Sequence, residues 1–345
     1  MSRHVDIGFV GCGFMGQVAH LANFARDPRC SIVAIADYRE DLARRVARRY
    51  SIPEVHRSHL DLLENSDVDA IVEITPDDVH VPVAVDAMKL GKHVYTEKPL
   101  STNLADAEKA ARTAEKHNVK LQVSYMKRYD PGVEIARRHL SRALDEGSMG
   151  QLTYVRSHGF GGDWICNVDR PITTDETPPP CDRANPKWLP DGLIEDYRTY
   201  LNVYCHNINL IRHFVGNPKS AEFASFRPRT KVLMMEYEDF PALVESGSLS
   251  ASFWDESTEV YLTDGRVSVD TPPPLFRNAT AKVDIYHAGD LQYSTKPRPR
   301  ADWSFRRSAR HFIDCILEDR EPRSSGRDSV EDIRLVEEAY RALTN

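Results

Sequence analysis

Residues 5–16, VDIGFVGCGFMG, decide the fold class of this 345-residue chain. A short apolar run that ends at Val10 is followed at once by a Gly-x-Gly-x-x-Gly pattern, which closes a strand with a tight turn and opens a helix. The first glycine permits the turn, the second lets a pyrophosphate approach the backbone, and the third lets the helix pack on the strand. The free N–H groups at the start of that helix would bind the anion. The residues predicted to line this loop are Gly11, Gly13, Phe14, Met15 and Gly16.

An acidic residue stands where a dinucleotide-binding unit needs one. Asp37 ends the second expected strand, 21 residues after Gly16. A carboxylate there accepts hydrogen bonds from the ribose hydroxyls of NAD and repels the 2′-phosphate of NADP. Arg39 favours the opposite choice, because a guanidinium two residues further on could cover that phosphate. We therefore expect NAD as the cofactor, with NADP less favoured.

The first 125 residues alternate short β-branched runs with amphipathic stretches, which is typical of β-α units around a parallel sheet. Strands are expected at 5–10, 31–36, 70–74, 93–96 and 120–124. Crossover helices are expected around 42–49, 81–88 and 105–117, and Ser101 and Thr102 are candidates for the N-cap of the last one. This pattern predicts an α/β fold in which residues 1–125 form a doubly wound Rossmann domain with a parallel sheet.

From about residue 151 the pattern changes to alternating Thr, Val, Tyr, Ser and Phe, which favours a largely antiparallel open sheet. Its strands are expected at 152–158, 221–226, 232–238, 247–253 and 259–262, with helices at 303–317 and 329–343. Residues 126–345 are therefore expected to form a second α/β domain, for substrate binding and oligomerisation, whose C-terminal helices could return to the first domain. Residues 164–196 are too long for a plain turn, so they predict a loop over a site or an arm toward another subunit.

Composition excludes several classes of protein. Lys and Arg number 45 against 52 Asp and Glu, a net charge of −7, so no basic surface for nucleic acid is expected. No apolar run reaches the roughly 18 residues of a membrane span, and residues 1–6 lack the apolar core of a signal peptide. Six scattered cysteines without a C-x-x-C pair fit neither a disulfide framework nor a zinc site. We expect a cytoplasmic protein without a metal.

A lysine follows the strand expected at 93–96, in the run Thr96-Glu97-Lys98-Pro99. The carboxyl end of a parallel sheet borders the crevice in which dinucleotides bind, so Lys98 is placed for chemistry. Pro99 would fix the backbone next to it, and the bond between them could be cis. The alternative is a surface lysine that precedes a helix.

Four elements in order resemble the glucose–fructose oxidoreductase, inositol dehydrogenase and rhizopine-catabolism (Gfo/Idh/MocA) oxidoreductases. They are the glycine loop, residues 74–80 (ITPDDVH), residues 97–99 (EKP) and residues 125–130 (YMKRYD). The resemblance implies a bound nicotinamide cofactor, oxidation or reduction of a sugar-like alcohol, Lys98 as the catalytic lysine, and oligomers (dimers or tetramers) formed through the open sheet. It adds Thr75, Pro76, His80, Glu97 and Lys98 to Asp37, Arg39 and the glycine loop as residues expected at the cofactor.

The chain departs from the family pattern in its second half. Family members often carry Asp-x-x-x-His at the start of a helix, where this chain has Asn202 and His206. Asn202 can hydrogen-bond a hydroxyl but cannot accept its proton. The spacing predicts one amphipathic helix with Asn202, His206, Asn209 and His213 along a polar stripe. The resemblance favours a catalytic His206 over a histidine that only packs in the core.

These residues predict a proton-transfer pair and a polar pocket. We expect His206 to accept the proton of a substrate hydroxyl while Lys98 holds the oxygen, and the reverse assignment stays open. Residues 125–130 could line the substrate cleft or could join the two domains. Tyr129 could equally be a packing residue, and Asp163 could equally cap a loop. The residues expected at the substrate are Lys98, Arg128, Tyr129, His158, Asp163, Trp164, Asn202 and His206.

Four functions are in competition. The favoured hypothesis is an NAD-dependent dehydrogenase that oxidises a ring hydroxyl of a sugar, glycoside or cyclitol. A redox-neutral catalyst that keeps its nicotinamide bound, including one that cleaves glycosides by transient oxidation, is the near alternative. A non-catalytic NAD(H) sensor is the third, and it would have no need of a proton-transfer pair. The fourth is a reductase of an imine or a tetrapyrrole, which a polar cleft suits poorly.

Overall fold

The computed structural model describes residues 4–165, 168, 170–182, 184–248, 252–289 and 291–344. Contacts divide the chain into two compact units, and each is described by itself. The first unit consists of Met1–Tyr125, Val168–Lys187 and Phe305–Ile333. The second unit consists of Met126–Asn167, Trp188–Ser304 and Arg334–Asn345.

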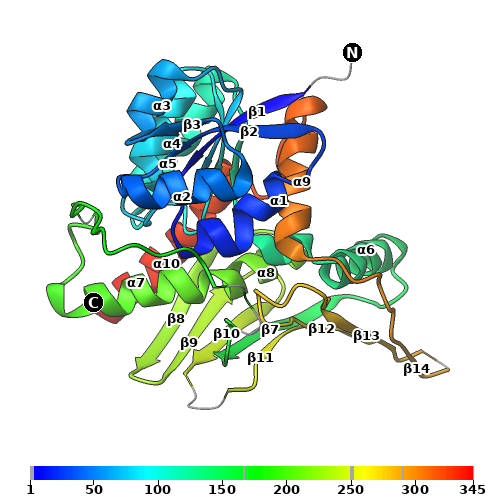
Figure 1. Ribbon diagram of the computed structural model, residues 1–345. Helices are drawn as coiled ribbons and strands as arrows, with labels where there is room; N and C mark the ends of the chain where they lie inside the picture. Colours follow the sequence, from blue (N-terminus) through cyan, green and yellow to red (C-terminus); the bar gives the residue numbers. More distant parts are fainter. Residues whose placement is uncertain are drawn as a thin grey trace. The chain divides into compact units, whose positions relative to one another are not determined.

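The described part of the first unit holds a six-stranded parallel sheet (Figure 1). Its strands are β1 (Val5–Val10), β2 (Cys30–Ala36), β3 (Glu54–His56), β4 (Ala70–Glu73), β5 (His93–Thr96) and β6 (Leu121–Val123). The spatial order is β3-β2-β1-β4-β5-β6, so the chain reverses direction across the sheet beside β1. This doubly wound order places a ligand crevice at the carboxyl ends of β1 and β4. The predicted Rossmann sheet is confirmed, with β3 added.

Helices cover the parallel sheet because its strands are apolar on both faces, as in β4, where every residue is buried. The helices of this unit are η1 (Gly16–Leu21), α1 (Ala22–Phe24), α2 (Glu40–Tyr50), α3 (His59–Asn65), α4 (His80–Lys89), α5 (Leu104–His117) and α9 (Ser304–Leu317). The expected helix at 303–317 is thus α9, and it packs in the first unit although it lies near the end of the chain.

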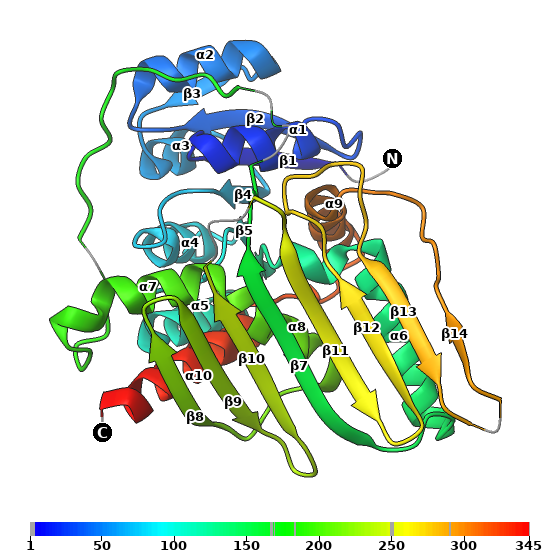
Figure 2. The ribbon, with the colours of Figure 1, turned by 90° about the horizontal axis from the view of Figure 1, so that it is seen from below.

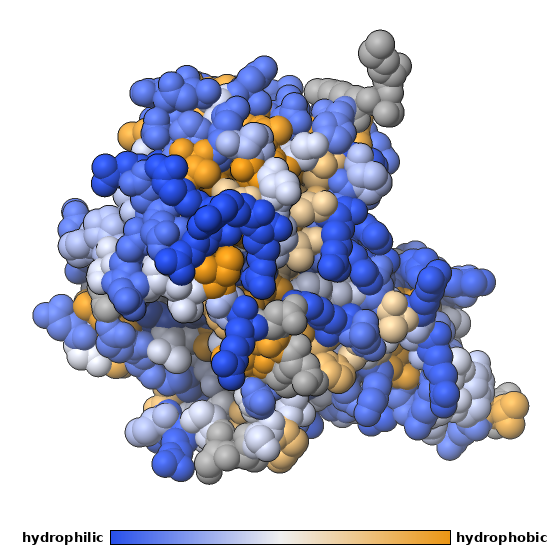
Figure 3. Space-filling model, viewed as in Figure 1, coloured by the Kyte–Doolittle hydropathy of each residue, from blue (hydrophilic) through white to orange (hydrophobic). Residues whose placement is uncertain are grey.

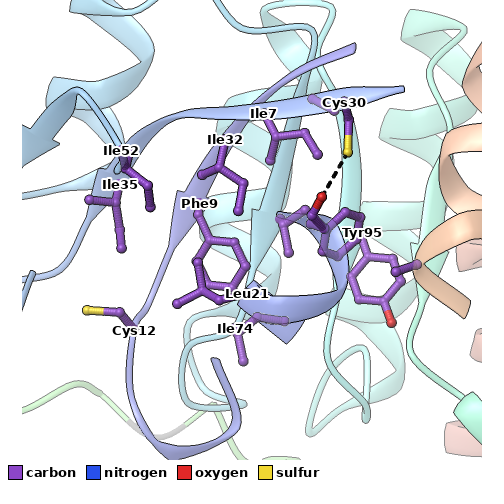
Figure 4. Close-up of a cluster of buried hydrophobic side chains, with 14 of the residues drawn as sticks. Ile7, Phe9, Cys12, Leu21, Cys30, Ile32, Ile35, Ile52, Ile74 and Tyr95 are labelled. Carbon is purple, nitrogen blue, oxygen red and sulfur yellow. Dashed lines mark hydrogen bonds between the residues drawn. The ribbon is translucent and has the colours of Figure 1, made fainter. Parts of the chain in front are cut away.

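Figure 4 shows the hydrophobic core of the first unit. Phe9 of β1, Ile35 of β2, Leu21 of η1 and Tyr95 of β5 belong to one buried cluster. Phe312 of α9 joins it and packs edge-on against Tyr95, with ring centroids 5.6 Å apart. This contact fixes α9 against β5 across more than 200 residues of sequence.

The described part of the second unit is built on an eight-stranded sheet (Figure 2). Its strands are β7 (Leu152–Gly161), β8 (Ser220–Arg227), β9 (Thr230–Glu236), β10 (Pro241–Gly247), β11 (Asp255–Leu262), β12 (Gly265–Asp270), β13 (Lys282–His287) and β14 (Tyr293–Thr295). The order is β14-β13-β12-β11-β7-β10-β9-β8, and every neighbouring pair is antiparallel except β7 with β10. Alternate residues of β11 are buried, which confirms the expected mostly antiparallel sheet with one covered face.

The remaining elements are helical. They are η2 (Met126–Tyr129), α6 (Pro131–Glu146), η3 (Asp191–Leu193), α7 (Ile194–Val203), α8 (Cys205–Val215) and α10 (Gly326–Thr344). The expected helix at 329–343 is the greater part of α10, which begins three residues earlier. Among the described residues, no helix is long and apolar enough to cross a bilayer. Figure 3 shows a mostly hydrophilic face with scattered hydrophobic residues.

Two local predictions are wrong. The strand expected at 247–253 is β10, which begins at Pro241 and ends at Gly247, while residues 249–251 lie outside the described residues. Proline hid this strand because it lacks an N–H, yet it is tolerated at the first position of a strand. The N-cap of α5 is Asn103, which accepts a hydrogen bond from Asp106 N at 2.9 Å, and not Ser101 or Thr102.

Candidate active site

The glycine loop leaves an open face at its second glycine. Gly11 has φ of +86°, and a Cβ there would lie 2.4 Å from the carbonyl oxygen of Ile74. A Cβ on Gly16 would lie 2.5 Å from the oxygen of Gly11. At Gly13, by contrast, the nearest atom is Arg39 Nη2 at 3.5 Å. The loop therefore fits a pyrophosphate that approaches the backbone beside Gly13. Phe14 is 36% exposed, and Met15 packs partly buried on the core.

Asp37 lies beside this loop, at the carboxyl end of β2. Its Oδ2 accepts hydrogen bonds from Cys12 N at 3.0 Å and from Arg39 Nη2 at 2.9 Å. Its Oδ1 accepts from Arg39 N at 2.9 Å and from Arg39 Nε at 3.0 Å. Burial would raise the pKa of Asp37, but the bonds from Arg39 and Cys12 outweigh burial and hold that pKa below its ordinary value. A carboxylate is thus present where the adenosine ribose of a dinucleotide binds.

A buried carboxylate joins the ends of β4 and β5. Glu73 accepts a hydrogen bond from Thr75 N at 2.9 Å, and its other oxygen accepts one from the Thr96 hydroxyl. Glu73 is fully buried, whereas Pro76 is exposed and Thr75 is half-buried. Glu73 therefore sets the backbone of the segment that carries Thr75 and Pro76.

Lys98 is half-buried and follows β5, between two braced neighbours. Glu97 accepts a hydrogen bond from Lys98 N at 3.0 Å, and its other oxygen lies 2.6 Å from His20 Nε2. Burial would raise the pKa of Glu97, but His20 and then Lys98 outweigh it and lower that pKa. The Lys98–Pro99 peptide bond is cis. Glu97 thus acts as an ionised acceptor that orients the backbone of Lys98.

His80 braces the other side of Lys98. Its Nδ1 lies 2.8 Å from Pro99 O, and its Nε2 lies 2.9 Å from Thr75 O. Burial would lower the pKa of His80, but Glu73 and these two carbonyl groups outweigh burial and raise it. A protonated ring can donate to both carbonyl groups. The geometry makes His80 a positioning residue for Thr75 and Pro99.

In the second unit, η2 contributes two buried cations. Lys127 Nζ forms an ion pair with Glu256 of β11 and lies 5.7 Å from the centroid of the Trp254 ring. Arg128 Nε donates to Asn209 Oδ1 at 2.5 Å, and Arg128 Nη2 donates to Asn209 O at 3.2 Å. Both side chains tie η2 to the sheet and to α8 within this unit.

The next two residues of the YMKRYD segment are buried. Tyr129 is 1% exposed. Asp130 is the N-cap of α6 and accepts hydrogen bonds from Gly132 N at 2.7 Å and from Ala281 N at 2.9 Å. Asp130 therefore fixes the start of α6.

Asn202 and His206 lie on different helices. α7 ends at Val203, the chain turns at Tyr204, and α8 begins at Cys205. Asn202 is exposed and His206 is 8% exposed. The expected single amphipathic helix is therefore wrong in this region.

The polar residues of α8 are buried because they bond inside the unit. Asn207 Nδ2 donates to Ser157 Oγ of β7 at 2.9 Å, and Asn209 accepts from Arg128. All residues from Cys205 to Phe214 are buried. The polar stripe is a set of internal contacts, and His206 stands at its first turn.

His158 of β7 lies between carboxylates of its two neighbouring strands. Its Nε2 is 3.0 Å from Asp255 Oδ2, and its Nδ1 is 3.5 Å from Glu245 Oε2. The ring stacks on Phe160 with centroids 4.7 Å apart. Such a pair of acceptors would hold the imidazole on the face of the sheet.

Asp163 and Trp164 follow β7 and are exposed. Asp163 accepts a hydrogen bond from Ile165 N at 3.0 Å, which fits the loop-cap alternative. Of the long segment that follows, Cys166, Asn167, Asp169 and Arg183 lie outside the described residues.

Residues 5–125 match the family described as "Oxidoreductase family, NAD-binding Rossmann fold", GFO_IDH_MocA. The chain thus carries the NAD-binding Rossmann fold of that oxidoreductase family in these residues. It is 23% identical to scyllo-inositol 2-dehydrogenase (NAD(+)) of Bacillus subtilis, over 93% of this chain and 89% of the relative. It is 24% identical to myo-inositol 2-dehydrogenase of Thermotoga maritima, over 76% of this chain and 75% of the relative.

A solved structure shares the fold of this chain along its length. Aldose-aldose oxidoreductase from Caulobacter crescentus, complexed with glycerol, superposes with a TM-score of 0.77 at 20% sequence identity. The match covers 99% of this chain and 98% of that chain. The two-sheet architecture is therefore shared with that structure.

The residues present fit the NAD that binds to this family. The open face at Gly13 admits a pyrophosphate, and ionised Asp37 can accept the ribose hydroxyls. Within the described residues, no group of three or more His, Cys, Asp or Glu side chains could hold a metal ion.

The structure gathers the predicted residues in two sets, one in each unit. The first unit holds the glycine loop, Asp37, Arg39 and the segments around Thr75 and Lys98. The second unit brings Arg128 against α8, whose second residue is His206, but it leaves Asn202 on another helix.

Sequence reasoning missed the residues that support these sets. His20 lies four residues after Gly16, so it faces the same side of the helix as the third glycine, and that spacing was an available signal. Glu73 gave a signal as the charged end of an otherwise apolar strand. Lys127 and Glu256 gave none, because 129 residues separate them.

Proposed function

We propose that this chain is an NAD-dependent dehydrogenase that oxidises a ring secondary hydroxyl of a sugar, glycoside or cyclitol. The observation that carries the proposal is Lys98, which follows β5 between a Glu97 braced by His20 and a Pro99 braced by His80. A lysine without chemistry would not need two buried histidines around its backbone. The names of the relatives support a polyhydroxylated substrate, since two of them act on inositols.

The protein's part in the reaction is to move one proton and hold one oxygen. NAD, when bound, supplies the hydride acceptor. The Lys98 ammonium donates a hydrogen bond to the hydroxyl oxygen and stabilises the negative charge that develops there. His206 takes the hydroxyl proton, because an imidazole ordinarily titrates near neutral pH and suits a general base. The carbon loses a hydride, the oxygen loses a proton, and a ketone results.

The remaining predicted contacts belong to this proposal as well. The residues proposed to surround the substrate are Arg128, Tyr129, His158, Asp163, Trp164 and Asn202. Arg128 would hold α8, and His158 would offer a ring that carboxylates orient. Thr75, Pro76 and His80 are proposed along the cofactor, where His80 acts through the backbone.

Two substitutions test the roles of the pair. Lys98→Ala and His206→Ala should each reduce turnover by roughly 10²–10⁴-fold, because a general acid or base contributes that much to the rate. The affinity for NAD, measured by isothermal titration, should stay within about threefold of wild type since neither change touches Asp37 or the glycine loop. Lys89→Ala, an exposed lysine of α4, is the matched control. Full activity in either variant contradicts that residue's assignment.

A further inference from the structure

The segment that includes residues 170–182 is attached to the glycine loop of the first unit. Gln17, next to the third glycine, donates through Nε2 to Ile172 O at 3.0 Å and accepts from Ile172 N at 2.8 Å through Oε1. The same Nε2 donates to Cys12 O at 2.9 Å. Ile172 also packs against the core cluster. These reciprocal bonds hold the segment at the edge of the sheet where a dinucleotide binds.

Four residues further on, the segment places a carboxylate at the start of α2. Glu176 Oε1 accepts from Asp41 N at 3.0 Å, and Oε2 accepts from Leu42 N at 3.0 Å. The Thr174 hydroxyl donates to Oε2 at 2.9 Å. The backbone bonds to Asp41 and Leu42 lower the pKa of Glu176, so the group is ionised at neutral pH.

Glu176 supplies what α2 lacks in its own sequence. The N-cap residue is Arg39, which makes no side-chain cap bond. Its guanidinium instead bonds Asp37 through Nε and Nη2 and lies over Gly13. Two carboxylates, Asp37 and Glu176, therefore face one guanidinium, and Glu176 acts electrostatically on both partners.

We propose that Glu176 is a specificity-determining residue that excludes NADP from the cofactor site. The inference rests on the proposed use of NAD and extends it to a residue outside the Rossmann sequence pattern. A 2′-phosphate on the ribose at Asp37 would carry about two negative charges into a place where Glu176 already adds a second carboxylate. The N–H groups of Asp41 and Leu42, which could bind that phosphate, are occupied by Glu176. Two donors of Arg39, Nε and Nη2, are already bonded to Asp37.

The experiment measures binding of NAD and of NADP by isothermal titration to the full-length chain and three variants. Glu176→Gln removes the charge but keeps an acceptor for the cap, so the segment can stay attached. Glu176→Ala removes both. Asp175→Asn removes the same charge from the exposed neighbouring residue and is the matched control.

We expect NADP to bind at least about tenfold more tightly to both Glu176 variants than to wild type, since removing a like charge near the ligand relieves repulsion. NAD affinity should change by less than about twofold, and the Asp175→Asn variant should resemble wild type. The gain should shrink when salt is raised, because screening weakens the repulsion that is being removed.

Two results overturn the inference while NAD still binds. The first is unchanged NADP affinity in both Glu176 variants, which would make Glu176 only a cap for α2. The second is an equal gain in Asp175→Asn, which would mean that net charge rather than position sets the preference. Absence of NAD binding to wild type is a separate outcome, and it overturns the proposed function itself.

Discussion

The carboxyl edge of the first unit's sheet and the covered side of the second unit's sheet use buried polar residues differently. At the edge, the side chain contacts the backbone: Asp37 accepts from Cys12 N, and Glu97 accepts from Lys98 N. In the second unit, side chains pair with each other, as Lys127 does with Glu256. A contact within a local motif, such as Glu97 with Lys98 N, can be anticipated from the sequence, whereas Lys127 and Glu256 meet only because segments distant in sequence pack together.

The largest effect is expected when a side-chain pair of the second unit is broken. Lys127→Met leaves Glu256 buried without its cation, and we expect the free energy of unfolding to fall by about 3–5 kcal/mol. Denaturant unfolding followed by circular dichroism measures it. In the exposed Glu108–Arg112 pair of α5, Arg112→Met should cost less than about 0.5 kcal/mol. Similar losses of unfolding free energy in Lys127→Met and Arg112→Met would show that breaking the buried ion pair costs no more than breaking the exposed one.

A double substitution sharpens that result. Lys127→Met combined with Glu256→Gln removes both charges, so much of the lost stability should return. If the loss of unfolding free energy in the double variant equals the sum of the losses in the two single variants, the two groups do not interact.

A smaller effect is expected from the backbone brace beside Lys98. Glu97→Gln keeps an acceptor for Lys98 N but loses the charge that pairs with His20, and we expect kcat to fall by up to about 100-fold, because small displacements of a reacting group have effects of that order. Affinity for NAD should be little changed. Glu64→Gln, an exposed position of α3, is the control. Unchanged kcat would show that Glu97 does not position Lys98.

The same variant gives a pH dependence with a definite sign. The pKa of Glu97 is lowered in the folded chain, so its ionised form stabilises the fold above the ordinary carboxyl pKa of about 4.3, and this contribution is lost as pH falls through the lowered value. Unfolding free energies measured between about pH 3 and 7 should show that the stability advantage of wild type over Glu97→Gln narrows toward acid. A difference that stays constant with pH contradicts an ionised Glu97.

The smallest effect is expected at the N-cap of α5. Asn103→Ala removes the acceptor for Asp106 N and should lower the free energy of unfolding by about 1 kcal/mol. Lys116→Ala, exposed in the last turn of the same helix, should change stability much less. An equal loss at both positions would count against Asn103 as the cap.

This contrast explains which parts of the structure could be predicted from the sequence. The glycine loop, Asp37 and the Lys98 segment were predictable because strand, turn and helix signals lie within a few residues of each other. β3 was missed because three residues carry too little pattern, and β10 was displaced because it opens with Pro241. The break between α7 and α8 was missed because Tyr204 turns the chain through a long-range bond from its hydroxyl to Gly247 O. Glu176 was unreachable since 135 residues separate it from Asp41.

The most direct test of the account is nicotinamide reduction, followed by absorbance, when the purified chain is mixed with NAD and a panel of free sugars, glycosides and inositols. The account predicts reduction with one of these substrate groups and its loss in Lys98→Ala and His206→Ala. Tight NAD binding without net reduction by any member of the panel would contradict it, and would favour a redox-neutral catalyst or an NAD(H) sensor instead.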